Sequence, residues 1–321
     1  MNFVASALPV LDPVSPQAAA ISDLFVVITI ACAIILAIVT TFVGICIVRF
    51  REKPGKEEPK QIFGNKRMEI AWTIAPFLLL VWMFFLTARG MNNSNPDAVA
   101  TREPDLVVVG HQWWWEVRYP KSGVVTANEI HIPVGQKLLV RLESADVIHD
   151  FWAPQLAPKM DMVPGHPNTL WLQADKPGTY DGACAEFCGT QHAWMRFLVI
   201  AESTEEFEKW EKGQKTTLVG NSSESKTMQG RNLFNDMTCV NCHVIRDSDA
   251  QAPLSLAQAG PDLTHFASRR TIGAGVLENN PANLKRWLKD PQLIKAGSKM
   301  PNLSLTDEQL DDLVKYFETL R

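Results

Sequence analysis

Residues 184–195, "CAEFCGTQHAWM", set two cysteines four positions apart and follow them with a histidine and a methionine. Taken alone, a C-x-x-x-C pair in an oxidising compartment favours a disulfide. A zinc site would need a second pair of cysteines or histidines at matching spacing, and residues 97–210 around the loop offer none. Soft ligands of this kind suit copper. The segment therefore raises a choice between a disulfide loop and a copper site.

A one-copper site of the blue-copper type takes one cysteine, two histidines and a weakly bound methionine. Cys188, His192 and Met195 supply three of these ligands from the loop, and His149 supplies the second histidine from a distant segment. Cys184 is then a surplus thiolate on the same loop. Two bridging thiolates can hold two copper ions and leave one histidine for each. The pattern favours a dinuclear copper site, with a disulfide as the alternative.

The chain around this loop is rich in valine, isoleucine and tryptophan over residues 97–210, and proline and glycine interrupt it at short intervals. Short alternating strands with such turns are typical of a β-sandwich or barrel. His149 ends a strand-like run some thirty-five residues before Cys184, a distance that suits the return strand of a Greek key. The remaining histidines of this region are interpreted as surface or packing residues: His111, His131 and His166.

Two uncharged apolar segments, residues 24–48 and 70–88, are each long enough to cross a bilayer as a helix. We expect transmembrane helices at about 22–49 and 68–89, within an N-terminal region of residues 1–96. The alternative is a buried helix hairpin of a soluble protein. Two segments of this length and purity are rare in soluble cores, so the sequence favours a transmembrane hairpin.

The charges beside these segments predict an orientation. The first twenty residues carry no Lys or Arg, whereas seven lie in or beside the connecting loop: Arg49, Arg51, Lys53, Lys56, Lys60, Lys66 and Arg67. The positive-inside rule places this loop in the cytoplasm and both termini on the other side. The start of the chain also lacks the basic region of a signal peptide, so the first span is interpreted as retained. We expect a multi-pass protein of the bacterial inner membrane, with its soluble domains on the periplasmic or outer side.

A second redox motif, "CVNCH", lies in the last third of the chain. Cys239, Cys242 and His243 match C-x-x-C-H, in which two thiols bind haem covalently and the histidine ligates its iron. A redox dithiol or half of a zinc site is the alternative. Met300, in "SKMPNL", offers the second axial ligand, and His265 is a rival for that position. Ligation by His and Met raises the haem potential, as an electron donor to copper requires.

The surroundings of this motif predict a helical domain. A polar linker over residues 211–223 precedes a domain of residues 224–321. "LTDEQLDDLVKYFETL" begins at a capping box formed by Thr306 and Gln309. The same helix places four apolar residues on one face: Leu310, Leu313, Val314 and Phe317. We expect this domain to be all-α.

Two longer stretches, "HDFWAPQLAPKMDMVPG" and "YDGACAEFCGTQHAWM", resemble subunit II of cytochrome c oxidase. The dinuclear copper centre of that family is called CuA, and its soluble domain is a cupredoxin-like sandwich. "GRNLF", with Gly230 and Phe234, and "AGPDL" likewise resemble class I cytochromes c. Related subunits of quinol oxidases have lost the copper ligands, whereas this chain has kept them.

The resemblance implies a role for each matching residue. His149 and His192 would be the terminal copper ligands, Cys184 and Cys188 would bridge the ions, and Met195 would be axial. The resemblance also implies that Met195 binds one copper ion and that Glu186 gives its backbone carbonyl to the other. The Glu186 side chain would also reach toward a magnesium ion shared with subunit I.

Three further residues gain roles only through the resemblance. Trp113, in "GHQWWWEVRYP", would be the electron input point, although Trp114 stands where the family usually has tyrosine. Asp146 matches an acidic position for docking the donor, and Glu69, in "MEIAW", matches the carboxylate at the entrance of a proton channel.

Together these features predict subunit II of a caa3-type oxidase: a transmembrane hairpin, a cupredoxin-like CuA domain and a fused cytochrome c domain. Haem c would pass electrons to CuA and on to the haems of subunit I, which reduces oxygen to water and translocates protons. The expected partners are subunits I and III, membrane lipid and an external donor such as a cytochrome c. A net charge of −4 without a long basic run argues against nucleic acid. The alternatives are the input subunit of a CuA-containing nitric oxide reductase and a membrane-anchored electron carrier.

Overall fold

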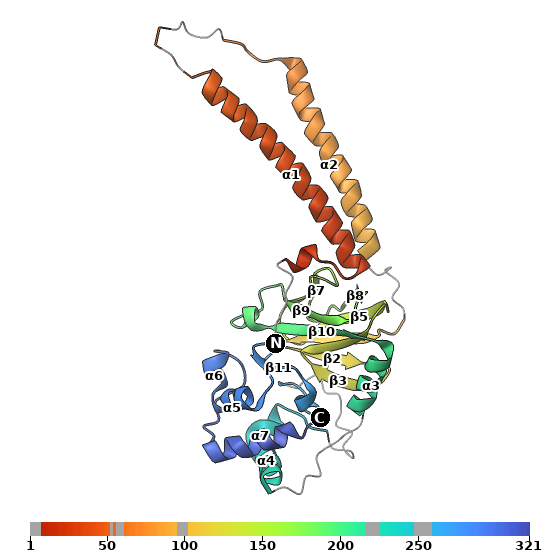
Figure 1. The fold of residues 1–321 in the computed structure, drawn as a ribbon, viewed down its shortest axis with the longest axis vertical. Coiled ribbons are helices and arrows are strands. Elements are labelled where there is room, and N and C mark those ends of the chain that lie inside the picture. Colours follow the sequence, from red (N-terminus) through yellow and green to blue (C-terminus); the bar gives the residue numbers. More distant parts are fainter. Residues whose placement is uncertain (1–7, 52–53, 56–60, 95–101, 216–224, 247–258) are drawn as a thin grey trace. The chain divides into compact units, whose positions relative to one another are not determined.

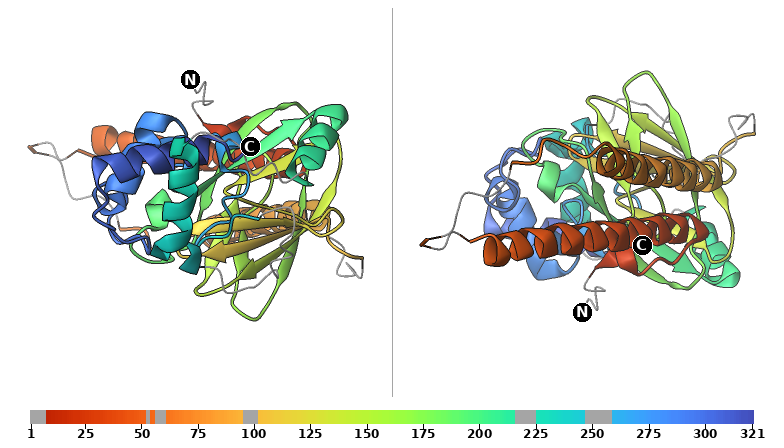
Figure 2. Two further views of the ribbon diagram at one scale, coloured as in Figure 1. Left: turned by 90° about the horizontal axis from the view of Figure 1, so that it is seen from below. Right: turned by 90° about the horizontal axis from the view of Figure 1, so that it is seen from above.

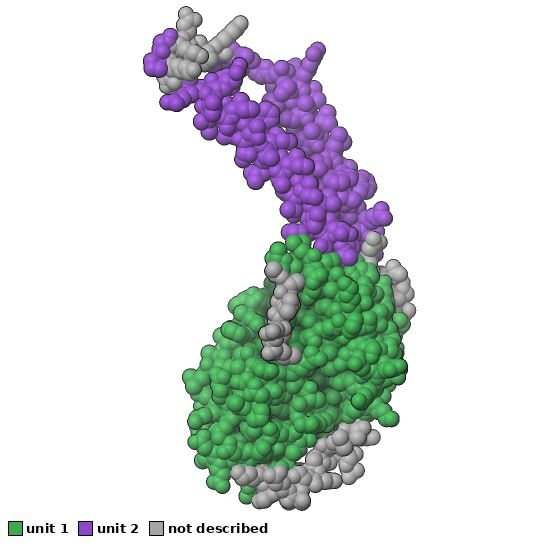
Figure 3. Space-filling view, in the orientation of Figure 1, with its two compact units in different colours: residues 1–18, 96–321 green, residues 19–95 purple. Residues whose placement is uncertain are grey.

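The computed structural model describes residues 8–51, 54–55, 61–94, 102–215, 225–246 and 259–321. The chain divides into two compact units, which Figure 3 colours separately. One comprises residues 19–95, and the other comprises residues 1–18 with 96–321. The second unit contains both the β-rich and the C-terminal helical regions.

Two long helices dominate the first unit: α1 (Pro16–Arg49) and α2 (Lys66–Ser94). Both are apolar enough to span a membrane, and their most apolar windows have no buried residues in the protein itself. Such exposed apolar surface requires lipid or protein around it. Both predicted helices are present: α1 begins earlier than expected and ends at the predicted residue, whereas α2 is longer at both ends. The basic loop residues Lys53, Lys56 and Lys60 lie outside the described part of the chain.

The β-rich region is a sandwich of two five-stranded sheets, as predicted. The first sheet has the order β3–β2–β1–β5–β8, and the second has the order β4–β10–β9–β6–β7. The strands of the first sheet are β1 (Leu106–His111), β2 (Trp114–Tyr119), β3 (Val124–Ala127), β5 (Leu138–Ser144) and β8 (Asn168–Leu172). Those of the second are β4 (Glu129–Pro133), β6 (His149–Trp152), β7 (Met160–Met162), β9 (Gly178–Cys184) and β10 (Arg196–Glu202).

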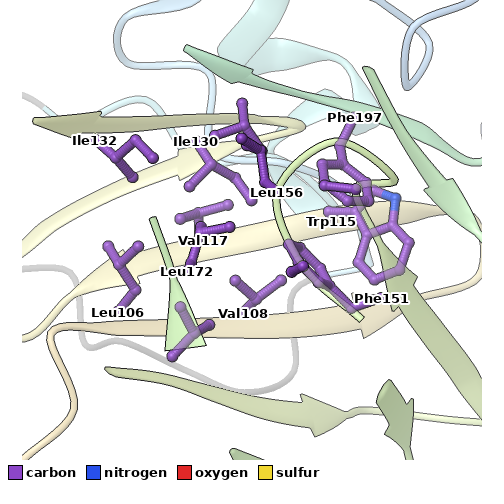
Figure 4. Packing of buried hydrophobic residues seen from close by; sticks show 14 of the residues in the cluster. Leu106, Val108, Trp115, Val117, Ile130, Ile132, Phe151, Leu156, Leu172 and Phe197 are labelled. Atoms are coloured by element: carbon purple, nitrogen blue, oxygen red, sulfur yellow. The ribbon is translucent and has the colours of Figure 1, made fainter. Parts of the chain in front are cut away.

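The inner faces of both sheets form one aliphatic and aromatic core. Three fully buried rings, those of Trp115, Phe151 and Phe197, pack at the end that Figure 4 shows on its right. The Phe151 and Phe197 rings stack with their centroids 4.6 Å apart. Strand β9 ends at Cys184 and β10 begins at Arg196, so the ligand loop connects two paired strands beside this aromatic cluster.

Two details of the prediction for the β-rich region and the linker were wrong. His149 begins strand β6 and does not end a strand, because the preceding strand β5 stops at Ser144 and a turn intervenes. The first part of the predicted linker, residues 211–215, belongs to helix α3 (Thr204–Lys215). This helix forms because its Trp210 packs on the sandwich, where its ring stacks on His131 with centroids 4.1 Å apart. Residues 216–223 of the linker lie outside the described residues.

The C-terminal region is mainly helical: α4 (Ser225–Asp236), α5 (Pro281–Lys289), α6 (Pro291–Ile294) and α7 (Asp307–Glu318), with a two-stranded hairpin of β11 (Thr271–Ile272) and β12 (Leu277–Glu278). The all-α prediction missed this small hairpin, whose two-residue strands give little sequence signal. In Figures 1 and 2 these helices, teal to blue, lie beside the yellow and green strands of the sandwich.

Helices α4 and α7 cross closely at Gly230. A Cβ atom there would overlap the carbonyl oxygen of Asp312 and lie 2.7 Å from Cβ of Tyr316. The predicted capping box is present: the Thr306 hydroxyl accepts from the Gln309 N–H, and the Gln309 side chain accepts from the Thr306 N–H. The four apolar residues predicted on one face of α7 are all buried.

Candidate functional site

The ligand loop and strand β6 bring sulfur and nitrogen atoms together. The Sγ atoms of Cys184 and Cys188 lie 3.7 Å apart, far beyond the roughly 2.05 Å of a disulfide. Nδ1 of His149 lies 3.9 Å from Sγ of Cys184, and Nδ1 of His192 lies 3.7 Å from Sγ of Cys188. The Met195 sulfur lies 3.8 Å from Sγ of Cys188. Five side chains predicted as ligands therefore converge on one point.

The donor set fits copper. Two thiols, two imidazoles and a thioether are soft or intermediate ligands, and Cys184, Cys188 and Met195 are buried. The carbonyl oxygen of Glu186 faces Sγ of Cys184 at 3.2 Å, so this carbonyl can also reach a metal. The Glu186 side chain is exposed. Among the described residues, the one group of three Cys, His or acidic side chains with metal-ligand spacing is His149, Cys184 and Cys188.

Asp146 orients His149. Its carboxylate accepts a hydrogen bond from Nε2 of His149 at 2.8 Å, which leaves Nδ1 to face the thiols. The same carboxylate accepts from the backbone N–H groups of Gln112 and Val147. Despite partial burial, these bonds hold the pKa of Asp146 well below its usual range. Sequence reasoning assigned Asp146 only a docking role, although its position three residues before His149 was the available signal.

The two thiols interact as a pair. The hydrogen bond that the two thiols share lowers the pKa of the Cys184 thiol, and burial opposes this change. The hydrogen bond to the Cys184 thiolate in turn raises the pKa of Cys188. Metal ions bind the thiolate form of cysteine. A metal cation bound between the two sulfur atoms would therefore favour ionisation of both thiols.

Trp113 packs directly against the loop. Its indole N–H donates to the Cys188 carbonyl at 3.0 Å, and the Gln112 side chain donates to the same oxygen at 2.9 Å. Trp114 has another role: it is buried, and its ring stacks on His111 with centroids 4.3 Å apart. Trp113 is therefore the member of the aromatic trio that touches the ligand loop.

The C-x-x-C-H segment borders a cavity of about 470 Å³. Cys239, Cys242 and His243 line it on one side, and Met300 also lines it, together with Trp287. Apolar side chains make up much of the remaining wall: Phe234, Leu263, Phe266, Leu284, Leu288, Leu313 and Phe317. An apolar cavity with two thiols and an imidazole fits a covalently attached haem.

The two predicted axial ligands, His243 and Met300, line the cavity, whereas the rival ligand His265 does not. His243 is oriented through Nδ1, which lies 2.8 Å from the carbonyl oxygen of Pro261, so Nε2 remains for the iron. Burial lowers the pKa of His243, which favours the neutral ligand form. His265 is buried too, but it is not among the residues that line the cavity.

The other predicted residues make structural contacts. The Glu69 carboxylate accepts from the backbone N–H of Asn65 at 3.1 Å and so caps the start of α2. His111 lies 3.0 Å from the Glu116 carboxylate, and His131 lies 3.0 Å from that of Glu202. His166 is exposed in a turn.

Fold and site together define a class: a protein with two helices apolar enough to span a membrane, a cupredoxin-like domain with a copper-type ligand set, and a helical domain with a haem-attachment motif. Three protein-family models match the chain. They are the cytochrome c oxidase subunit II transmembrane domain over residues 4–87, its periplasmic domain over 122–202, and cytochrome c over 227–321.

Named relatives agree with these matches. Cytochrome c oxidase subunit 2 of Alkalihalophilus pseudofirmus is 38% identical and covers 98% of this chain and 91% of its own length. The subunit of the same name from Bacillus subtilis is 35% identical over 86% of this chain and 81% of its own length. Quinol oxidase subunit 2 of Bacillus cereus is 32% identical over 64% of this chain and 72% of its own length.

The chain belongs to the cytochrome c oxidase subunit II family. It is a membrane-bound subunit of a cytochrome c oxidase, and subunit I of the oxidase is its implied partner. The subunit II domain implies copper, and the cytochrome c domain implies haem c. The predicted fold class is thereby confirmed for all three of its parts.

Proposed function

We propose that this chain is the electron-input subunit of a caa3-type haem–copper oxidase. In this role the chain would carry electrons from its cytochrome c domain through its cupredoxin-like domain to subunit I, where oxygen would be reduced to water and protons would be translocated. Haem c and a thiolate-bridged copper pair supply reversible one-electron chemistry when bound. The residues of this chain would hold both groups and orient them.

The position of Trp113 is the observation that carries the proposal. Its indole N–H donates to the carbonyl of Cys188, and its side chain lines the cavity that Cys239, Cys242 and His243 border. One rigid aromatic residue therefore contacts both candidate redox sites. We assign Trp113 as the electron input point of the copper centre.

The ligand assignments follow from the contacts. His149 and His192 each aim Nδ1 at one thiol, so they are proposed as the terminal copper ligands. Cys184 and Cys188 are proposed as the bridges. Two further ligands complete the set, namely the thioether of Met195 and the carbonyl of Glu186. Cys239 and Cys242 would hold haem c, with His243 and Met300 on its iron.

Other proposed roles involve additional subunits. An exposed Glu186 carboxylate is free to share a magnesium ion with subunit I, which would have to supply further ligands. Glu69 is proposed at a proton-channel entrance and Asp146 at a docking position. Both already have a hydrogen-bonding role inside the chain. Subunit III, membrane lipid and a soluble cytochrome c are the remaining proposed partners.

The proposed location is the bacterial inner membrane, with both termini and both soluble domains on the periplasmic or outer side. The basic residues between the spans support this orientation. The family model for the β-rich region is also described as periplasmic.

Spectroscopy of the purified oxidase tests the proposal. We expect an electron paramagnetic resonance signal of a mixed-valence copper pair, two copper ions per chain, and the optical bands of one covalent haem c. A chain that binds haem but only one copper ion, or none, would contradict the dinuclear assignment.

The alternative in which nitric oxide is the substrate keeps the same ligands and the same spectra. The catalytic subunit that copurifies, assayed with oxygen and with nitric oxide, separates the two reactions. Purification without any many-span haem protein would instead favour a free membrane-anchored electron carrier.

A further inference from the structure

Lys295 is a buried lysine between the two soluble domains. Only 4% of its surface is exposed, although lysine is almost never fully buried without partners. Its ammonium group donates to three backbone carbonyls: Trp113 at 3.0 Å, Trp194 at 2.9 Å and Gly273 at 2.9 Å. All three N–H bonds of the ammonium are therefore used.

The three acceptors come from both domains. Trp113 and Trp194 belong to the cupredoxin-like domain. Gly273 lies in the β11–β12 hairpin of the cytochrome domain, which also contains Lys295. Trp113 contacts the carbonyl of Cys188, and Trp194 immediately precedes Met195. Lys295 thus fixes the backbone next to two proposed copper ligands and joins it to the cytochrome domain.

The surrounding contacts are buried as well. The Glu129 carboxylate, 2% exposed, accepts from the backbone N–H groups of Arg270 and Thr271 at 2.7 and 2.9 Å. The N–H of Arg196 donates to the carbonyl of Ala274 at 3.1 Å. Ala274 forms a small buried apolar cluster with Trp114 and Ala127.

The hairpin approaches the sandwich very closely. A Cβ atom on Gly275, whose φ is +79°, would lie 2.9 Å from Cβ of Arg196. The Gln191 side chain, from the ligand loop, donates to the carbonyl of Ala296. These are contacts of a packed interface and differ from the wet, charged rim of a transient encounter.

Net charge does not account for this association. Residues 97–210 contain nine Lys or Arg and sixteen Asp or Glu, whereas residues 224–321 contain twelve of each. A domain without net charge is attracted only weakly to an acidic one. The local buried contacts must therefore set the relative position of the domains.

We propose that Lys295 is the positioning residue that holds the cytochrome domain on the ligand loop, so that the C-x-x-C-H cavity faces Trp113 while electrons are transferred. The consequence for electron transfer rests on the proposed function, whereas the docking itself does not. In this position Trp113, Trp114 and Asn128 of the cupredoxin-like domain line the cavity together with Cys242 and His243.

Amide hydrogen exchange of the full-length, metal-loaded protein tests the docking. The N–H groups of Arg196, Arg270 and Thr271 are bonded across the interface, so they report on docking directly. Replacing Lys295 by Met leaves three carbonyls without a donor, and we expect exchange at these amides to accelerate at least about tenfold. Amides inside β1 and α7 should keep their protection. Lys289→Met, an exposed lysine of the same domain, is the matched control.

A kinetic measurement accompanies the exchange experiment. In Lys295→Met the haem-to-copper electron transfer should slow, while donor-to-haem transfer and both optical and paramagnetic spectra stay unchanged. Lys295→Arg, which retains a charged donor, should recover part of the amide protection and of the rate. Unchanged protection at the three amides, or exchange that rises throughout α7, would overturn the positioning role. Absent copper or haem signals in the unmodified protein would refute the proposed function instead.

Discussion

Cys184 and Cys188 lie against each other inside the sandwich, whereas Cys239 and Cys242 border a cavity of about 470 Å³. In the first region five side chains from two parts of the chain already face one another. In the second region the proposed ligands Cys242, His243 and Met300 face a volume that the protein does not fill.

The difference reflects how each domain completes its core. The sandwich buries Trp115, Phe151 and Phe197 behind the ligand loop, so its core is complete without a metal ion. The helical domain has a smaller core, and many residues of that core also line the cavity. We infer that copper binds a preformed site, whereas haem is part of the folded core of its domain.

Loss of haem attachment should have the largest effect. In a Cys239→Ser, Cys242→Ser double variant, an unfilled cavity of this size would cost on the order of 10 kcal/mol, comparable to the whole stability of a domain. Amide protection in α4 and α7 should therefore collapse, while the β-strands and the copper signal persist. Amide hydrogen exchange and paramagnetic resonance check these two results. If the amides of α7 stayed protected without haem, the inference that haem is part of the folded core of this domain would be wrong.

Loss of a bridging thiol should remove the copper pair without unfolding its domain. Cys184→Ser deletes one proposed bridge, so the mixed-valence signal should vanish and leave at most a mononuclear site. The sandwich should lose no more than about 1–2 kcal/mol, because its core does not depend on the metal. Cys46→Ser, at an exposed position of α1, is the control. A surviving mixed-valence spectrum would show that Cys184 does not bridge.

The buried carboxylate of Glu116 contributes to the stability of the sandwich. Its carboxylate bonds to His111 and Arg118, and these contacts outweigh burial and lower the pKa of Glu116 below 4.5. Glu116→Gln should cost about 2 kcal/mol at pH 7. Since the folded pKa is depressed, this contribution is complete above about pH 4.5 and disappears as the pH falls through the folded pKa.

Thermal unfolding of the full chain at several pH values measures this effect. The difference between Glu116→Gln and the unmodified protein should narrow in acid. Glu143→Gln removes a more exposed partner of Arg141 and should have a small effect at any pH. A difference that stays constant from pH 7 to pH 3 would contradict the assigned ionisation.

The smallest expected effect concerns the helix cap of the cytochrome domain. Thr306→Ala removes the side-chain acceptor of the Gln309 N–H and should cost about 1 kcal/mol. Thr306→Ser should retain the cap. Urea unfolding followed through haem absorption gives the comparison. A loss as large as that caused by removing haem would mean that α7, and not the haem, dominates the stability of this domain.

Much of the fold could be predicted from local patterns. Two apolar runs of membrane length, alternating strand residues and the Thr306 capping box each act over a few residues, and each appears in the structure. The start of β6 at His149 and the extension of α3 to Lys215 were missed. These depend on a turn and on packing of Trp210, which local patterns do not encode.

The sequence by itself determined the chemistry of the candidate sites, because ligand type and spacing are local properties of "CAEFCGTQHAWM" and "CVNCH". Only the tertiary structure decided what surrounds them. Asp146 turns His149 toward the thiols, and Lys295 joins carbonyls from residues 113 and 194 to its own domain. Such contacts require the fold to bring distant backbone groups together and bury them. The sequence places Asp146 near His149, but nothing around Lys295 in the sequence indicates its three carbonyl partners.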